Sequence, residues 1–407
     1  MKIIQVNVVN NHGSTGKIMY DIHKNLISNG YEARICYGVG AVSNDLDTYK
    51  FCNEFERKFN AIISRITGIP FGGAYRSTSK LVSYIEKEKP DIVHLHCING
   101  YTVNIYKLLK YLGTKKIKTL LTLHAEFFYT GGCGHSFECN KWKTGCYKCP
   151  VFRTELKSFI FDNTSSAWRK MRQAFGYFDK TSIQITAVSP WLKSRAKESK
   201  NLNRFDINVI LNGVDTNIFK PVSPENEFVK LFPQKNFTKI ILHVTANFSL
   251  NQNDIKGGRY IEELAELRPN DLFIIVANNI SNLHQLPTNI FIWGRAKNQK
   301  ELAKLYSIAD LTVITSKRET FSMVTAESLC CGTPVVGFKA GGPESIALED
   351  YTEFVEYGDI NALNLSISNI MVNNKDIARI SMEAKKIYSS EIMSNNYIKA
   401  YDKLLIK

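Results

Sequence analysis

Short apolar runs recur along the whole chain and are separated by segments long enough to form a helix. They cover residues 3–9, 33–37, 92–96, 119–124, 185–189 and 208–211 in the first half, and 239–245, 272–277, 290–293, 311–315 and 334–338 in the second. Apolar runs that do not alternate with polar residues are typical of strands buried on both faces of a parallel sheet. We therefore predict an α/β chain of two Rossmann-like, doubly wound domains facing an interdomain cleft, with ligands at the carboxyl ends of the strands.

The length and composition of the chain agree with two globular domains. Its 407 residues are 44% hydrophobic and 22% charged, which describes a folded protein of ordinary composition. We place the first domain at 1–220 and the second at 221–389, and expect a C-terminal helix at about 390–407 to pack back on the first. No run approaches the roughly 18 apolar residues of a membrane span, and the N-terminus lacks a signal-peptide pattern. We expect a cytoplasmic chain.

The segment Gly13-Ser14-Thr15-Gly16-Lys17 resembles a phosphate loop at first sight. A nucleotide-hydrolase loop needs a glycine five residues before its Gly-Lys pair and a hydroxyl residue after the lysine. Here those positions hold Asn11 and Ile18, so the hydroxyl that binds magnesium is absent. What remains is a strand, a glycine turn and a helix, whose first N–H groups suit an anion. The alternative is that the glycines only form the turn.

Positive charge dominates the chain, with a net charge of +14 and a pI near 9.2. Basic runs lie at 110–118, 168–172 and 193–200. They are either solvated faces or a surface for nucleic acid, an anionic membrane or a phosphorylated substrate. Because no nucleic-acid-binding motif is visible, we expect no nucleic-acid partner and favour a membrane surface or a phosphate.

The stretch SKRETFSMVTAESLCCGTPVV, residues 316–336, carries two acids eight residues apart, Glu319 and Glu327. The first is expected in a loop after a strand and the second in a helix that begins near 321–322. Free N–H groups at that helix start would face the loop. Carboxylates suit sugar hydroxyls and amides suit phosphate, so the stretch predicts a nucleotide-sugar site. In the alternative interpretation Glu319 caps the helix and Glu327 is a surface acid.

This acidic motif, with the following AESLCCGTPVV at 326–336, resembles the donor-binding signature of retaining glycosyltransferases of family four. Those enzymes have the two-domain GT-B fold, and many build bacterial surface polysaccharides. Further matches lie where that fold would place them, namely TLHAEFFYTGGC at 122–133, VSPW at 188–191, ILNGVDTNIFKP at 210–221 and ELAKLYSIADLTVITS at 301–316. The resemblance covers nearly the whole chain.

The resemblance implies roles for individual residues. Glu319 would hold donor-sugar hydroxyls, Glu327 the ribose, and Lys256 the diphosphate, while His124 would lie beside the reacting carbon. The implied donor-binding set is Gly13, Ser14, Asn247, Lys256, Arg295, Glu319, Thr320, Phe321, Ser322, Met323, Val324 and Glu327, and the implied catalytic set is His124, Lys256 and Glu319.

Two positions depart from the family pattern. Relatives often carry an arginine where this chain reads Thr245-Ala246-Asn247, which leaves Lys256 without that cationic partner; Arg295 and Arg318 are the candidates to replace it. Relatives also often read His-Asp where this chain reads His124-Ala125-Glu126, which leaves the role of Glu126 open.

The implied reaction is metal-independent transfer of a hexose-type sugar, with retention, from a nucleotide-diphosphate donor to a saccharide or lipid-linked acceptor. No cofactor is needed for it, and the chain would work on the inner face of the membrane. A nucleotide-sugar epimerase or hydrolase on the same fold, and a donor-binding module without activity, are the alternatives.

Four of the nine cysteines lie within 17 residues, at Cys133, Cys139, Cys146 and Cys149. Four thiolates with a Cys-x2-Cys pair suit a structural zinc ion. Reduced loop cysteines and a disulfide or redox pair are the alternatives. Some similar glycosyltransferases carry such a loop, and a metal there would brace the acceptor-side loop without taking part in the chemistry.

Overall fold

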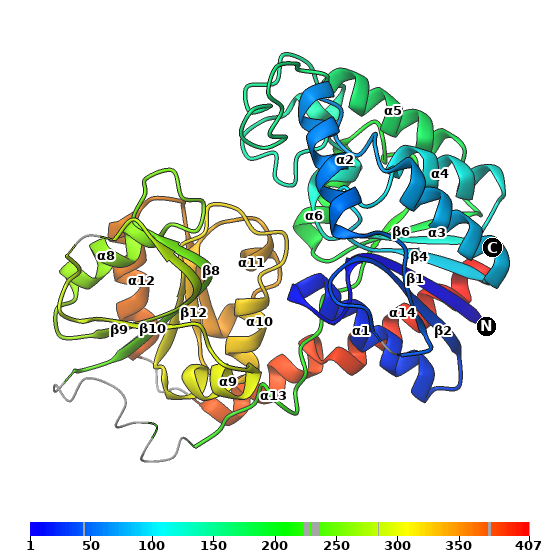
Figure 1. The fold of residues 1–407 in the computed structure, drawn as a ribbon. Helices are drawn as coiled ribbons and strands as arrows, with labels where there is room; N and C mark the ends of the chain where they lie inside the picture. The colour runs from blue at the N-terminus through cyan, green and yellow to red at the C-terminus, as the bar shows by residue number, and fades with distance from the viewer. Residues whose placement is uncertain (44, 224–227, 229–236, 284, 373–375, 407) are drawn as a thin grey trace. The chain divides into compact units, whose positions relative to one another are not determined.

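The computed structural model describes residues 1–43, 45–223, 228, 237–283, 285–372 and 376–406 (Figure 1). The chain divides into two compact units, Met1–Leu211 together with Met393–Lys407, and Asn212–Ile392. The division at 211 comes earlier than the boundary at 220 expected from the sequence. Part of the sequence expected at the start of the second domain, 224–227 and 229–236, lies outside the described residues.

The first unit is built on a seven-stranded parallel sheet with the order β3-β2-β1-β4-β5-β6-β7. Its strands are β1 (Lys2–Val9), β2 (Glu32–Val39), β3 (Thr48–Lys50), β4 (Ile92–Leu95), β5 (Thr119–Leu123), β6 (Ile183–Ala187) and β7 (Ile207–Val209). The connections run outward in opposite directions from β1 and β4, so the topological switch point lies between these two strands.

Helices cover both faces of this sheet: α1 and α14 lie on one face, and α3, α4 and α5 lie on the other (Figure 1). Their bounds are α1 (Gly13–Ser28), α2 (Glu54–Thr67), α3 (Tyr75–Glu88), α4 (Ile105–Thr114), α5 (Thr164–Gly176), α6 (Pro190–Glu198) and α14 (Ser390–Ile406). Side-chain caps begin several of them. Asn53, Asn104 and Ser189 accept hydrogen bonds from the backbone N–H three residues later, which satisfies an otherwise unpaired donor at the helix start.

The second unit has a six-stranded parallel sheet with the order β10-β9-β8-β11-β12-β13. Its strands are β8 (Ile240–Ser249), β9 (Leu272–Ser281), β10 (Ile290–Gly294), β11 (Leu311–Ile314), β12 (Val335–Phe338) and β13 (Thr352–Val355). Its helices are α8 (Gly258–Leu267), α9 (Gln299–Ile308), α10 (Met323–Cys330), α11 (Gly342–Ser345), α12 (Ile360–Val372) and α13 (Ile377–Tyr388). The switch point of this sheet lies between β8 and β11.

The predicted strands are confirmed within a few residues, and the sequence analysis missed two. β3 and β13 are short edge strands of mixed composition, TYK and TEFV, without the apolar run that marks the others. β6 begins at Ile183, two residues before its predicted start, because Ile183 and Gln184 are also buried.

The C-terminal helix α14, expected near 390–407, lies against the first sheet through two buried tyrosines. The Tyr401 hydroxyl is 2.7 Å from Nδ1 of His94, and the Tyr397 hydroxyl is 3.2 Å from Oγ1 of Thr122. Both tyrosines are fully buried. Helix α14 therefore belongs to the core of the first unit, although the rest of that unit ends at Leu211.

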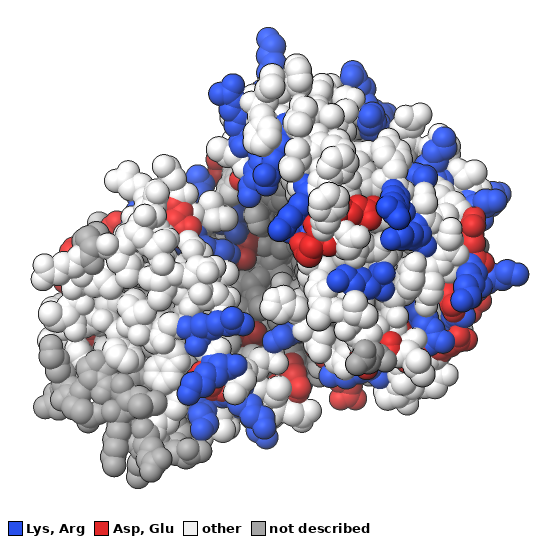
Figure 2. Space-filling view, in the orientation of Figure 1, with Lys and Arg blue, Asp and Glu red and all other residues white. Residues whose placement is uncertain are grey.

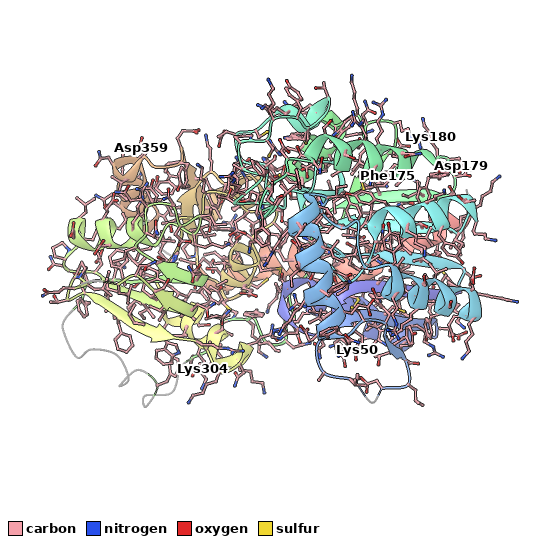
Figure 3. All side chains as sticks on the ribbon, turned by 45° about the horizontal axis from the view of Figure 1, so that its top comes forward. Lys50, Phe175, Asp179, Lys180, Lys304 and Asp359 are labelled. Atoms are coloured by element: carbon pink, nitrogen blue, oxygen red, sulfur yellow. The ribbon has the colours of Figure 1, made fainter. Side chains whose placement is uncertain are left out.

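Charged side chains lie mainly on the outside of each unit. Phe175 of α5 is buried, whereas Asp179 and Lys180 in the turn that follows are exposed at the edge of the first unit (Figure 3). Many Lys and Arg side chains cover the surface of that unit (Figure 2). None of the described helices combines the length and apolar content that crossing a membrane requires.

Candidate active site

The switch point of the second sheet brings together two residues that lie 63 positions apart in the sequence. Lys256 follows β8 and Glu319 follows β11, and the Lys256 Nζ lies 2.5 Å from Glu319 Oε1. Both side chains are about three-quarters buried, with exposed fractions of 25% and 24%. In open α/β sheets the carboxyl ends of strands at the switch point form the ligand-binding crevice. The second unit therefore presents an ion pair at the place where such a sheet binds its ligands.

Two glycines let the Lys256 segment approach the sheet. Gly257 has φ of +71°, and a Cβ there would lie 2.3 Å from the carbonyl oxygen of Thr315. A Cβ on Gly258 would lie 2.5 Å from the carbonyl oxygen of Ser249. The Thr315 hydroxyl also donates to the carbonyl of Lys256 at 2.9 Å. The turn is thus fastened between the ends of β8 and β11, where no larger residue fits.

The loop that carries Glu319 is held by backbone hydrogen bonds to the segment before α11. Glu319 N–H donates to Ala340 at 3.0 Å, and Gly342 N–H donates to the Glu319 carbonyl at 2.8 Å. A Cβ on Gly342 would lie 2.5 Å from the nitrogen of Phe321. The Glu319 carboxylate is therefore placed by backbone pairing rather than by a flexible loop, and its side chain does not cap the helix.

Helix α10 begins beside this loop, as predicted. Its N-cap is Ser322, which has φ of +86° and whose hydroxyl accepts from Thr325 N–H at 3.3 Å. Phe321 is buried under the turn, and the first turn of the helix contains no acidic residue. A helix start without its own acid leaves the positive end of the dipole available to an anion. Thr320, Met323 and Val324 are half-buried around it.

Glu327 lies on the same helix, one turn and a half further on. Its carboxylate accepts a hydrogen bond from the Tyr306 hydroxyl at 3.0 Å. Tyr306 is fully buried, and burial together with this carboxylate raises its pKa well above the ordinary value, so the phenol remains protonated and donates. Glu327 is half-buried rather than an ordinary surface acid.

Asn247 and Arg295, two other residues predicted to bind the donor substrate, differ in their surroundings. Asn247 lies in β8, half-buried, and its side chain bonds to Asp254, next to Lys256. Arg295 is exposed after the edge strand β10, and among the described residues it makes no contact with Lys256 or Glu319. The structure therefore places Asn247 near the ion pair and gives Lys256 a carboxylate partner, not Arg295.

A buried histidine lies under the same site. His243 of β8 donates its Nδ1–H to the Val313 carbonyl at 3.1 Å, and burial lowers its pKa to about 4. The positive charge of Lys256 acts in the same direction. His243 is therefore neutral at pH 7 and adds no repulsion to the nearby ammonium group.

In the first unit the predicted glycine turn begins α1. Gly13 has φ of +63°, and both Gly13 and Ser14 are exposed. The N-cap residue His12 makes no side-chain cap, and the first turn holds no acid. Asn7, at the end of β1, accepts from Cys97 N–H at 3.1 Å and donates to the Val9 carbonyl at 2.9 Å. This helix start has open N–H groups at the switch point of the first sheet.

His124 follows β5 and belongs to a stack of three buried histidines. Its Nε2 lies 3.2 Å from Nδ1 of His96, whose Nε2 lies 3.1 Å from Oε1 of Gln5. The rings of His94 and His96 are 3.8 Å apart between centroids. Burial lowers the pKa of His124 to about 4, and lowers those of His94 and His96 well below the ordinary value. All three are neutral at pH 7.

This chain of contacts holds the His124 ring in place. Nε2 of His124 is hydrogen-bonded to Nδ1 of His96, and the other ring nitrogen of His96 is hydrogen-bonded to the side-chain amide of Gln5. Because both imidazoles are neutral, one of the two facing ring nitrogens donates and the other accepts.

The Glu126 carboxylate holds the loop after β5 in place. Its buried carboxylate accepts from Arg195 Nε at 2.7 Å, from the Tyr129 hydroxyl at 2.9 Å and from the backbone N–H and hydroxyl of Ser136 at 2.5 and 3.0 Å. Arg195 also lies over the ring of Trp142 at 4.8 Å. These bonds fasten the loop after β5 to α6 and use the whole carboxylate, so Glu126 is not free to replace the aspartate of relatives.

Several thiols of the cysteine loop lie close to one another. The thiols of Cys133 and Cys149 are hydrogen-bonded, which lowers the pKa of Cys149 to about 7, while burial raises that of Cys146 to about 12. Cys139 lies close enough to affect Cys146. Within the described part of the chain no group of three or more His, Cys, Asp and Glu side chains is arranged to hold a metal ion. Zinc binding therefore stays a prediction.

His94, His96 and Gln5 were missed in the sequence analysis because they lie inside predicted strands. The sequence Val93-His94-Leu95-His96 did carry a signal, because a buried strand of a parallel sheet rarely contains two histidines. The partners are 91 and 307 positions away, which no local pattern reveals.

Comparisons with known proteins agree with this geometry. Residues 15–218 match the family model described as Glycosyltransferase Family 4, and residues 276–387 match Glycosyl transferases group 1. The chain is 21% identical over 421 residues to the putative colanic acid biosynthesis glycosyl transferase WcaC of Escherichia coli (strain K12), covering 99% of this chain and 100% of the relative. It is 21% identical over 328 residues to N-acetyl-alpha-D-glucosaminyl L-malate synthase of Bacillus anthracis, covering 80% and 76%.

Solved structures share the fold. HepE of Anabaena in complex with UDP superimposes with a TM-score of 0.67 at 17% identity, covering 99% of this chain and 100% of that one. A glycosyltransferase from Rickettsia africae ESF-5 gives 0.64 at 18% identity, covering 99% and 98%. The predicted GT-B fold of two Rossmann-like α/β domains is confirmed.

The buried histidines predict a loss of stability in mild acid. Between about pH 6.5 and pH 4 the unfolded chain binds protons that the folded chain excludes, so the free energy of unfolding falls as the pH falls, by up to about 1.4 kcal/mol per pH unit for each such group. Urea unfolding measured from pH 7.5 to 4.5 tests this. His96→Asn should flatten the dependence, and His12→Asn, at an exposed site, should not. An unchanged slope in His96→Asn would contradict the assignment.

The Glu126–Arg195 pair predicts a large stability effect. Arg195→Met leaves a fully buried carboxylate without its cation and should cost about 3–5 kcal/mol. The double variant Glu126→Gln/Arg195→Met should lose less than the two single variants added together. Tryptophan fluorescence in a urea titration follows the transition, because Trp142 contacts Arg195. As a control, Arg57→Met removes the exposed partner of Glu54 and should change stability little. Additive losses would show that the two residues act separately.

The zinc prediction is tested by metal content. Protein purified without chelator should hold one zinc ion per chain by inductively coupled plasma mass spectrometry, and Cys146→Ser should lose it. Cys52→Ser, outside the cysteine loop, is the matched control. A wild-type chain with less than a tenth of an equivalent would show that these are reduced loop cysteines or a disulfide.

Proposed function

Because the chain belongs to glycosyltransferase family 4, we propose that it moves a hexose-type sugar from a nucleotide-diphosphate donor to a saccharide or lipid-linked acceptor, with retention at the anomeric carbon. The observation that carries this proposal is the Lys256–Glu319 pair at the switch point of the second sheet, beside the start of α10. Such a site offers a cation, a carboxylate and free amides together.

The donor proposal has support in the solved structures. HepE of Anabaena, which shares the fold, was solved in complex with UDP, with UDP-glucose, and with UDP and glucose. On this proposal the N–H groups of Phe321, Ser322 and Met323 meet the diphosphate and sugar, and Glu327 meets the ribose. The Tyr306 hydroxyl then orients the Glu327 carboxylate at 3.0 Å.

The ion pair determines how the leaving group would be stabilised. An ammonium group has three donors, and Glu319 uses one of those of Lys256, so two remain for diphosphate oxygens. Charge that develops on the departing diphosphate is stabilised by groups already held in place. On this proposal the Lys256 ammonium group stabilises the charge of the departing diphosphate, which a divalent metal ion does in many transferases.

On this proposal the first unit contributes a neutral imidazole. His124 would lie beside the reacting carbon of the donor sugar. Gly13 and Ser14 would close on the donor through the open N–H groups at the start of α1. The oxygen of the leaving phosphate would take the acceptor proton on the same face.

The acceptor is the least defined part of the proposal. The similarity to WcaC, a putative colanic acid biosynthesis enzyme, supports a role in polysaccharide synthesis. The positive net charge of +14 supports work at an anionic membrane surface on the cytoplasmic side.

Loss of either member of the ion pair should impair transfer. Lys256→Ala and Glu319→Ala should each lower kcat by about 10²–10³-fold, as removal of one pre-positioned electrostatic group does. The double variant should lose much less than the product, because each single variant already disrupts the same unit. The measurement is nucleotide release and sugar transfer from a panel of UDP- and GDP-sugars, with Lys300→Ala, an exposed lysine of α9, as control.

The same assay separates the alternatives. Excess EDTA should leave the rate unchanged if Lys256 replaces a metal. Donor turnover without any acceptor would indicate a hydrolase or epimerase, and calorimetric donor binding without turnover would indicate a binding module. Full activity in both single variants would contradict the assigned roles.

A further inference from the structure

Helix α2 turns an apolar face toward solvent. Phe55, Phe59, Ile62 and Ile66 are 82%, 56%, 48% and 49% exposed. Their spacing of four, three and four residues places them on one side of the helix. A surface helix normally packs such a stripe inward, so these four residues, called here the α2 ridge, are an exposed apolar patch that needs a partner.

A second exposed apolar segment is fastened to the end of the same helix. Phe159, Ile160 and Phe161 are 56%, 65% and 53% exposed. Phe159 N–H donates to the Arg65 carbonyl at 2.9 Å, and Asn163 Nδ2 donates to the Thr67 carbonyl at 2.7 Å. Ridge and loop thus belong to one surface of the first unit, held together by backbone contacts.

Basic side chains border this surface. Arg65, Arg153, Lys157 and Phe159 line one shallow depression, and Arg57 and Lys58 lie on α2 itself. Three acids lie nearby: Glu54 pairs with Arg57 at 2.9 Å, Glu56 accepts from Ser77 N–H at 2.7 Å, and Glu155 lies between Arg153 and Lys157 in the sequence. In Figure 2, white side chains over α2 lie among blue Lys and Arg side chains.

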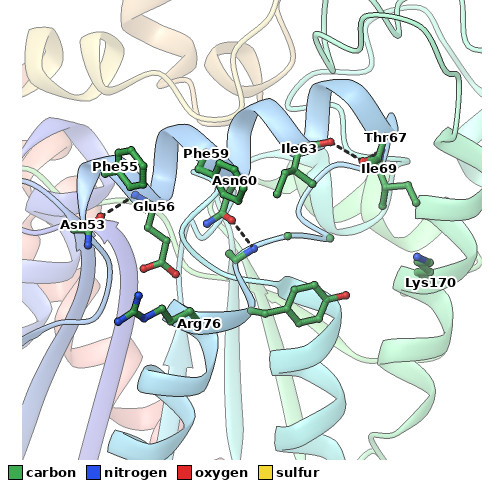
Figure 4. Close-up of a pocket in the computed structure, with 14 residues that line it drawn as sticks. Asn53, Phe55, Glu56, Phe59, Asn60, Ile63, Thr67, Ile69, Arg76 and Lys170 are labelled. Carbon is green, nitrogen blue, oxygen red and sulfur yellow. Dashed lines mark hydrogen bonds between the residues drawn. The ribbon is translucent and has the colours of Figure 1, made fainter.

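A cavity of about 590 Å³ opens beside the ridge (Figure 4). Its walls are mostly apolar, from Phe55, Phe59 and Ile63 of α2 and from Ile69 and Tyr75. The charged residues of the lining are the two cations Arg76 and Lys170 and one acid, Glu56. The Asn60 side chain accepts from Ala74 N–H at 3.0 Å and fixes the far wall against α2. The combination of an apolar hollow with cations in its lining suits an amphiphile with an anionic head.

We infer that the α2 ridge, the 159–161 loop and the bordering basic residues form the surface by which this protein docks on a bilayer containing anionic phospholipid. This inference rests on the proposed function, whose membrane partner it locates on the fold. Aromatic and branched side chains enter the headgroup–acyl boundary, and the Lys and Arg side chains pair with lipid phosphates. The docking is peripheral, since no described helix could span the bilayer.

The charge of the chain decides between a membrane and a second copy. Two chains with a net charge of +14 each, joined through a surface rimmed by arginine and lysine, would repel one another. An anionic lipid surface complements both the apolar centre and the basic rim. A protein partner or a homodimer is therefore an outcome that the experiment must be able to reveal.

The test is vesicle flotation of the full chain with phosphatidylcholine alone and with phosphatidylcholine containing about 30% phosphatidylglycerol, an anionic phospholipid. Wild type should float with the anionic vesicles about tenfold more than with the neutral ones, and less at high salt. Phe55→Ser/Phe59→Ser should lower partitioning about tenfold. Leu46→Ser/Leu365→Ser, at two other exposed apolar positions, should not.

Transfer to a soluble acceptor is measured on the same variants and should stay at the wild-type rate, so failure of the membrane inference is distinguished from failure of the proposed function. Equal flotation of the ridge variant and wild type, or equal flotation on neutral and anionic vesicles, would overturn the inference. So would a wild-type dimer in light scattering that the ridge variant dissociates, because that result would assign the surface to self-association.

Discussion

The site of the second unit depends on the absence of a side chain at Gly257. With φ of +71° and the Thr315 carbonyl oxygen 2.3 Å from where a Cβ would be, no other residue could occupy the turn without moving β11 away from β8. That contact places Lys256 beside Glu319 although 63 residues separate them. The backbone pairing of Glu319 with Ala340 and Gly342 then holds the carboxylate from its other side.

The ion pair also offsets the desolvation of its two side chains. A charged group that is three-quarters buried loses solvation, and an opposite charge 2.5 Å away compensates for that loss. His243 contributes by staying neutral, because its buried Nδ1–H is committed to the Val313 carbonyl. In the proposed reaction, a diphosphate oxygen bound to Lys256 would share the ammonium group with Glu319, which already takes one of its hydrogen bonds.

The two sheets and the acidic motif could be predicted from the sequence because each is marked by a local pattern of residues. Strand runs are apolar over four to eight residues, and the residues from Glu319 to Glu327 lie in one stretch. The sequence analysis missed β3 and β13, whose edge positions remove the need for an apolar run. The sequence could not predict that Glu126 forms an ion pair with Arg195, or that Arg295 lies after the edge strand β10. Both depend on how distant segments of the chain pack together.

The α2 ridge shows a different limit. Periodicity identifies an amphipathic helix, yet it does not say which face turns inward. In α2 the buried residues are Asn60, Ala61 and Ser64, small or polar, while Phe55, Phe59, Ile62 and Ile66 are exposed. The sequence analysis attributed the membrane face to basic runs alone, and of those runs 168–172 reaches the proposed surface through Lys170.

The two units contribute unlike chemistry to the proposed reaction. The first unit offers a histidine that burial keeps neutral and a neighbouring chain of hydrogen bonds that holds its ring in place. A neutral imidazole can accept a proton or a hydrogen bond, but it cannot offset the charge of a departing diphosphate. That charge must be met by the second unit, where a lysine and a helix start without acidic residues lie together. If the proposed reaction is correct, the histidine comes from the first unit and the groups that stabilise the leaving charge come from the second, so neither unit alone would carry the complete set.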